Sequence, residues 1–225
     1  MKKSLFLIGM VLIISMRMLT AQSVNLSIKG GFLYPSGSID SDVGAVLTGS
    51  VENKFNKYLS LGINGKWGGS NYTDEENFWN ENVLIQENEL DISNFVYACN
   101  VFSKISFLTG DEIILSLVPE LGFYLIESRP VIYFNDKSVI DVTHKNYDSK
   151  FARGLSYGLH LEGQYYLNEK INILARIGWN NYNIGSSLNK VDLGNDWNSK
   201  LNEKSDFLYF ELGMVYLLFG KNYQE

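Results

Sequence analysis

The chain has few of the residues that build disulfide frameworks and metal centres. Cys99 is the only cysteine among 225 residues, and His144 and His160 are the only histidines. One cysteine excludes an internal disulfide and a cysteine-rich zinc site, and two histidines argue against a histidine-built metal centre. The net charge of -6 is opposite in sign to the basic footprint of nucleic-acid-binding proteins. We therefore expect no cofactor, no metal ion and no nucleic-acid partner.

The N-terminus has the features of a secretory signal peptide. Two lysines precede an apolar segment at 5–14, and a small-residue cleavage site follows at 19–21. Arg17 interrupts the apolar segment before it could span a bilayer. We predict that residues 1–21 are removed during export through the general secretory pathway, which leaves one domain of residues 22–225.

Stretches with helical spacing are lacking, and only three prolines interrupt a chain rich in glycine and aromatic residues. Apolar and polar residues instead alternate with a period of two, which indicates strands. The eight predicted strands cover 24–34, 43–54, 59–68, 90–102, 113–124, 155–165, 171–180 and 208–218. Most are long enough to cross a membrane, which takes about 9–11 residues. The fourth strand alternates least clearly, and we assign its apolar face to Phe95, Tyr97, Cys99 and Val101.

The predicted connections differ in length at the two ends of the strands. Tight or modest turns lie near 56–57, 109–111 and 168–170. Long loops cover 70–89, 126–150 and 185–205. This layout is typical of an outer-membrane barrel with periplasmic turns and extracellular loops. The expected fold is therefore all-β, an eight-stranded antiparallel up-and-down transmembrane β-barrel.

The alternation does not by itself say which face is inside, because a soluble barrel exchanges the two faces. The polar face is rich in glycine, as a crowded lumen requires. Its charges balance: Lys29, Lys54, Lys66 and Arg176 against Glu52, Glu120, Glu162 and Glu211. Aromatic residues near both ends of the apolar face match the interfacial girdles of membrane barrels. We predict that the apolar face contacts lipid. We place a lumen polar network at Lys29, Glu52, Lys66, Glu120, His160, Glu162, Arg176 and Glu211.

The turn at 168–170 predicts the register of the strands that flank it. With a three-residue hairpin loop, Leu167 pairs with Ile171 and Glu162 faces Arg176. The sum of paired residue numbers must be even, because an odd sum would place lumen residues opposite lipid-facing ones. We expect a charge-assisted contact between Glu162 and Arg176, with strong coupling in a double-mutant cycle.

One group of residues on this face suggests catalysis. Ser156, His160 and Glu162 are the residue types that a lipid A deacylase uses on a small barrel. Its nucleophile stands two residues from its histidine, where this chain has Gly158 and Glu162, and its catalytic groups face lipid. We therefore favour a polar network with no catalytic residues.

The 70–89 loop contains several acidic residues and no lysine or arginine. Its carboxylates include Asp74, Glu75, Glu76, Glu81 and Glu87. Carboxylate oxygens could bind a divalent cation, but the spacing matches no EF-hand pattern. We favour a solvated loop.

The C-terminal segment 211–219 resembles the assembly signal of outer-membrane barrels, with Glu211, Gly213, Tyr216, Leu218 and Phe219 at its positions. The stretches 118–125 and 173–176 are similar to the small PorT-like outer-membrane β-barrel domain family, eight-stranded barrels of OmpA-like type. The resemblance implies delivery by periplasmic chaperones, insertion by the barrel-assembly machinery and no shared active site.

These observations predict a monomeric, non-enzymatic protein in the outer membrane of a Gram-negative bacterium. It would contact membrane lipid and lipopolysaccharide, and its long loops would mediate adhesion or other envelope interactions. An eight-stranded lumen filled by side chains argues against a porin. Two alternatives remain open: a lipid A modifying enzyme, and a secreted soluble barrel that binds an apolar ligand.

Overall fold

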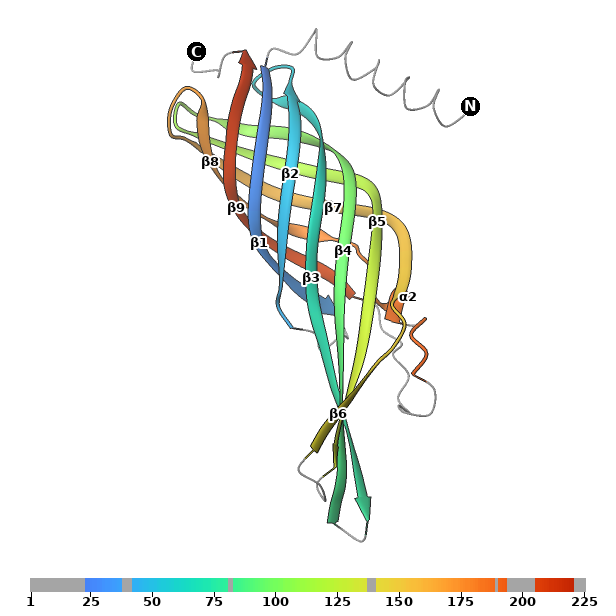
Figure 1. The fold of residues 1–225 in the computed structure, drawn as a ribbon. Helices are drawn as coiled ribbons and strands as arrows, with labels where there is room; N and C mark the ends of the chain where they lie inside the picture. The colour runs from blue at the N-terminus through green and yellow to red at the C-terminus, as the bar shows by residue number, and fades with distance from the viewer. Residues whose placement is uncertain are drawn as a thin grey trace, which may run out of the picture.

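The computed structural model describes residues 23–37, 42–80, 83–136, 141–188, 190–193 and 205–220, and strands dominate it (Figure 1). The strands are β1 (Ser23–Gly37), β2 (Gly44–Lys54), β3 (Leu59–Asn80), β4 (Val83–Thr109), β5 (Ile113–Asp136), β6 (Asp141–Asn146), β7 (Lys150–Tyr166), β8 (Ile171–Asn180) and β9 (Ser205–Gly220). A short helix, α2, covers Gly185–Leu188. No helix of the described ranges is long and apolar enough to cross a membrane. The predicted signal peptide lies outside the described residues.

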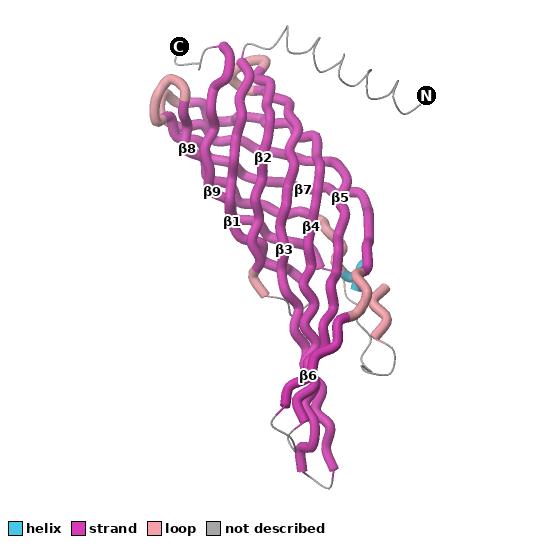
Figure 2. Tube along the Cα trace, in the orientation of Figure 1, coloured by secondary structure: helices cyan, strands magenta, loops and turns pink. Residues whose placement is uncertain are grey.

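Eight of the strands close into a ring (Figures 1 and 2). Its order is β1, β2, β3, β4, β5, β7, β8 and β9, and every neighbouring pair is antiparallel, including β9 with β1. Closure pairs each strand on both sides, so no free edge faces the bilayer. The predicted eight-stranded antiparallel barrel is confirmed.

The outward face of the barrel is apolar, and the inward face is polar and buried. Ile28, Leu121 and Leu212 point outward and are 56%, 62% and 53% exposed. The strand with the least clear alternation follows the same rule: Tyr97 and Val101 are exposed, as predicted for its apolar face. An apolar exterior around a charged interior is the reverse of a soluble barrel, so the outward face is the one that contacts lipid.

Two of the predicted long loops are strands. β3 and β4 continue beyond the barrel as one hairpin, with Tyr72 paired to Ile92 and Asp74 to Leu90. β5 runs on to Asp136 beside β4, and β6 pairs with its last residues. These parts of β3, β4, β5 and β6 form a sheet that projects from the barrel, at the bottom of Figure 1 and away from the start of β1 and the end of β9. We call it the projecting sheet. The loop prediction was wrong for residues 70–80, 83–89, 126–136 and 141–146, because strand pairing needs only backbone hydrogen bonds and these stretches lack regular alternation.

The third predicted long loop begins inside the mouth of the barrel. Tyr182, Ile184, Leu188 and Leu193 are at most 6% exposed. They belong to one hydrophobic cluster with inward side chains of the barrel wall, which include Leu33, Ile92, Ile126, Phe207 and Tyr209. At this end of the barrel, residues 182–188 and 190–193 therefore form an apolar plug, whereas residues 194–204 of the predicted loop lie outside the described residues.

Candidate functional site: the charged lumen

The eight residues predicted for the lumen network all lie inside the barrel, each at most 7% exposed. They come from β1, β2, β3, β5, β7, β8 and β9. Lys104 on β4, 5% exposed, is a further buried charge that the sequence interpretation missed. The sequence contains a signal for Lys104, because Cys99 and Val101 were assigned to the outward face. The strand period of two then predicts that the even-numbered residues of this strand point inward.

Glu120 is the centre of one half of the network. Lys66 Nζ lies 2.7 Å from Glu120 Oε2, and the Arg176 guanidinium pairs with Oε1. Asn64 Nδ2 donates a hydrogen bond of 2.8 Å to Oε1, and His160 Nε2 lies 3.4 Å from Oε2. Two cations therefore share one carboxylate in an interior closed to water, where charges must be paired to be tolerated.

Lys104 is the centre of the other half. Its Nζ lies 2.5 Å from Glu52 Oε2 and 2.7 Å from Glu162 Oε1. Gln164 Nε2 donates a further hydrogen bond of 2.9 Å to Glu162. A cation from β4 is thus held by carboxylates from β2 and β7, on opposite parts of the ring.

Arg176 joins the two halves. It is the register partner of Glu162, and the Leu167 N–H donates to the Ile171 carbonyl at 3.0 Å, so the predicted register is confirmed. Arg176 Nε lies 3.9 Å from Glu162 Oε2, and Arg176 Nη1 lies 3.7 Å from Glu211 Oε2. Both members of the predicted pair have closer partners, Lys104 for Glu162 and Glu120 for Arg176.

The lumen holds more charge than the sequence suggested. Its buried charged residues are Lys29, Lys54, Lys66, Lys104 and Arg176 against Glu52, Glu120, Glu162 and Glu211. No group of three or more His, Cys, Asp and Glu in the described part of the chain could hold a metal ion. The arrangement can lock the positions of the strands, because each misplaced strand would leave a buried charge unpaired.

The candidate catalytic residues are not assembled into a relay. Ser156 donates to Asn100, and Glu162 is bound by Lys104 and Gln164. His160 meets the Tyr209 ring edge-on, with ring centroids 6.0 Å apart. Ser156, His160 and Glu162 are at most 2% exposed and face the lumen, away from the lipid side where acyl chains lie.

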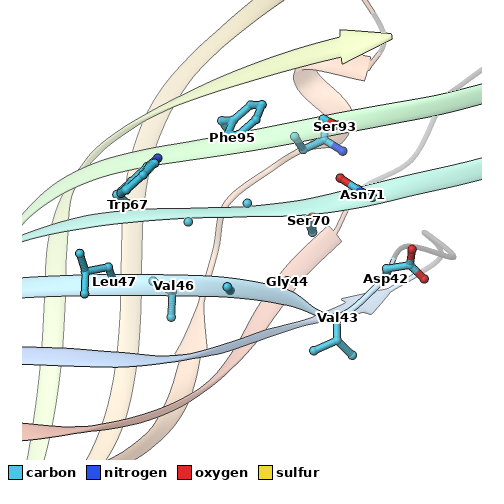
Figure 3. A pocket seen from close by; sticks show the side chains of 14 residues that line it. Asp42, Val43, Gly44, Val46, Leu47, Trp67, Ser70, Asn71, Ser93 and Phe95 are labelled. Carbon is cyan, nitrogen blue, oxygen red and sulfur yellow. The ribbon is translucent and has the colours of Figure 1, made fainter. Parts of the chain in front are cut away.

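The outward face carries a groove at the loop end of β2, β3 and β4 (Figure 3). It encloses about 570 Å³, with apolar walls at Leu47, Trp67 and Phe95 and polar residues Asp42 and Asn71 at its far end. The change from apolar to polar lining marks where the lipid-facing band gives way to the projecting sheet.

Gly213 should be needed for stability. A Cβ there would lie 2.2 Å from the Ile28 carbonyl oxygen and 2.7 Å from Lys29 Cγ, whereas one at the lipid-facing Gly49 would meet nothing within 4 Å. Gly213→Ala should lower the free energy of unfolding by about 1–3 kcal/mol through overpacking. Gly49→Ala should change it by less than about 0.5 kcal/mol. Urea unfolding with lipid vesicles measures both, and equal effects would contradict the crowding at Gly213.

No protein-family model matches the chain, and no curated protein matches its sequence. Among solved structures, a major outer membrane protein from Thermus thermophilus is similar over 87% of this chain and 100% of its own, at 14% identity and a TM-score of 0.50. The outer membrane protease OmpT from Escherichia coli matches 88% of this chain and 98% of its own, at 11% identity and a TM-score of 0.42. Ail, the attachment invasion locus protein of Yersinia pestis, matches 87% and 97%, at 15% identity and a TM-score of 0.38. The likeness to the Thermus thermophilus protein, together with the closed ring of strands, shows the β-barrel fold of outer-membrane proteins.

Proposed function

We propose that the chain is an outer-membrane anchor that holds the projecting sheet at the cell surface, where the sheet serves adhesion or another envelope interaction. The observation that supports this most is the continuity of β3, β4 and β5. Each runs unbroken from the lipid-facing band into the projecting sheet. A sheet held by three continuous strands is positioned by the barrel, as a binding surface should be.

The orientation follows from the lengths of the connections. The turns at 55–58, 110–112 and 167–170 lie at the same end as the start of β1 and the end of β9. Short turns face the periplasm in barrels of this class, and long extensions face outward. We propose export through the general secretory pathway with removal of residues 1–21, and a monomeric barrel of residues 22–225 in a Gram-negative outer membrane.

Labelling of intact cells tests this topology. In a Cys99→Ser background, which removes the one free cysteine, Glu75→Cys on the projecting sheet should react with a membrane-impermeant maleimide. The control Asp111→Cys, at the turn end, should react only after permeabilisation. If intact cells label Asp111→Cys and not Glu75→Cys, the barrel has the opposite orientation. Recovery of the protein outside the outer-membrane fraction would contradict the anchor role.

Tyr216 should matter more for insertion than for final stability. It lies on the lipid face of β9, 44% exposed, within the segment that resembles an assembly signal. We expect Tyr216→Asp to slow membrane insertion in cells by about tenfold, with a smaller effect on unfolding of the refolded protein in detergent. Tyr165→Asp, a lipid-facing tyrosine on β7 that is 45% exposed, is the matched control. Equal insertion rates for both variants would argue against β9 as the strand read by the barrel-assembly machinery.

We propose no enzymatic role. The lumen is closed by paired charges and by the plug, and its Ser, His and Glu side chains have other partners. A lipid A modifying enzyme would need catalytic groups on the lipid side. A soluble carrier of an apolar ligand would need an apolar lumen, whereas this lumen is charged. Lipid and lipopolysaccharide are proposed as contacts of the outward face, with the groove of Figure 3 at their polar boundary.

A further inference from the structure

One edge of the projecting sheet has no neighbouring strand among the residues that the structure describes. β2 pairs with β3 only as far as Gly69, and the last contact on that side is a hydrogen bond of 2.8 Å from the Asp42 N–H to the Asn71 carbonyl. β3 continues to Asn80 with β4 on its other side. Among the described residues no strand pairs with the β2 side of residues 73–80. A row of unpaired backbone groups is a template for another strand.

Two hydrogen bonds show which residues face this edge. The Asn71 carbonyl points to the β2 side. The alternation of an antiparallel strand therefore directs the backbone N–H and C=O groups of Thr73, Glu75 and Asn77 to the same side. The Glu75 N–H accordingly donates to the Asp74 carboxylate at 2.9 Å instead of to β4. An incoming carbonyl could replace that side chain as the acceptor.

The outer face beside the edge is acidic. Glu75 pairs directly with Glu89, and Thr73 with Asp91, on the side of the sheet that continues the lipid-facing face. None of the ion pairs in the described ranges involves Asp42, Glu75, Glu89 or Asp91. Burial, and after it the nearby Asp42 carboxylate, raise the pKa of Asp91. Like charges directly opposed across strands are destabilising, and a cation between them would relieve the repulsion.

Two common blocks of a free edge, lysine and proline, are missing here. Natural edge strands are commonly blocked by lysine or proline, and residues 70–89 contain no lysine, arginine or proline. β6, which forms the other edge of the projecting sheet, carries Lys145. A second copy of the chain that paired β3 with β3 would place acid against acid. Charge thus disfavours self-pairing and favours a basic partner.

We propose that the β3 edge at residues 73–77 binds an extended segment of another protein by antiparallel strand addition, with lysine or arginine at alternate positions of that segment. The basic side chains lie on the outer face beside Glu75, Glu89 and Asp91. In an antiparallel ladder, a residue opposite Glu75 directs its own N–H and C=O at β3. The basic residues of the segment therefore also make the backbone hydrogen bonds. This inference deepens the proposed function, on which it rests, by naming the chemistry of the partner.

Peptides that differ only at backbone nitrogens test the geometry. The purified full chain in lipid nanodiscs is titrated with a fluorescent eight-residue peptide of alternating lysine and threonine, and binding is followed by anisotropy. N-methylation of the lysine nitrogens should weaken binding by at least about tenfold, because it removes several hydrogen bonds to β3. N-methylation of the threonine nitrogens, which face solvent, should change binding less than about twofold. Equal effects of the two peptides, or no binding of the parent peptide at about 1 mM, would overturn strand addition.

A charge exchange tests the basic specificity. Glu75→Lys should weaken binding of the lysine peptide about five- to tenfold at low salt and should favour a glutamate–threonine peptide instead. Asp111→Lys, at the far end of the barrel, should alter neither. If the glutamate–threonine peptide binds the unmodified chain as tightly as the lysine peptide does, the inference is wrong. Concentration-dependent oligomers that Thr73→Pro abolishes would assign the edge to a second copy and would also overturn it.

The peptide titration is independent of where the protein lies in the cell. Surface labelling of Glu75→Cys without peptide binding would leave the anchor role intact and remove this inference. Peptide binding by a protein that is labelled only after permeabilisation would support this inference and contradict the anchor role at the cell surface.

Discussion

Replacing Glu120 with glutamine is expected to destabilise the barrel by about 3–5 kcal/mol, because it leaves two buried cations without their shared carboxylate. Lys66 and Arg176 both pair with Glu120, and the three side chains are at most 1% exposed. Glutamine keeps the shape and can still accept the hydrogen bond from Asn64. The loss of stability therefore measures the effect of removing the negative charge. Urea unfolding with lipid vesicles, compared at a constant m-value, measures it.

The same strand offers a matched control. Glu127 on β5 pairs with the half-exposed Arg129 at 2.7 Å, outside the lumen. Glu127→Gln should cost less than about 1 kcal/mol, as exposed ion pairs do. Comparable losses for Glu120→Gln and Glu127→Gln would show that the Glu120 cluster is well solvated and would contradict a closed lumen.

The second large effect is the coupling between Glu162 and Lys104. In a double-mutant cycle of Glu162→Gln and Lys104→Met, we expect a coupling energy of about 2–3 kcal/mol, because their 2.7 Å contact is a charge-assisted bond in a closed interior. The cycle of Glu162→Gln with Arg176→Met should give a smaller value. There the nearest atoms are 3.9 Å apart, and Arg176 retains Glu120.

The two cycles share one variant, so their difference does not depend on the effect of Glu162→Gln alone. The sequence predicted strong coupling for Glu162 and Arg176 from register, and the register is confirmed. A coupling energy for Glu162 and Arg176 that equals or exceeds the value for Lys104 would mean that register neighbours outweigh contacts across the lumen.

Local periodicity was enough to predict the ring of strands and the direction of their side chains. Alternation with a period of two is a property of the backbone and of one buried face. It placed Lys29, Glu120 and Glu211 inside and Ile28, Leu121 and Leu212 outside, as observed. The turn at 168–170 also determined one register, because a short hairpin leaves a single pairing open.

Strand length could not be predicted in the same way. The stretches at 70–80 and 126–136 lack the regular alternation that reveals a half-buried strand, yet they pair by continuing the register of the barrel strands. The plug was hidden for a related reason. Tyr182 and Ile184 alternate with polar residues but out of phase with the apolar face of β8, and their burial depends on the width of the mouth that receives them.

The sequence by itself determined the barrel, its lipid-facing surface and all of the charges inside it except Lys104, because these follow from the spacing of residues along the chain. Only the tertiary structure decided which charges meet. Glu120 on β5 binds Lys66 on β3 and Arg176 on β8, and Lys104 on β4 binds Glu52 on β2 and Glu162 on β7. None of these partners lie on adjacent strands. Their contacts depend on the curvature that brings separate strands together across the lumen, and that curvature exists only once the ring is closed.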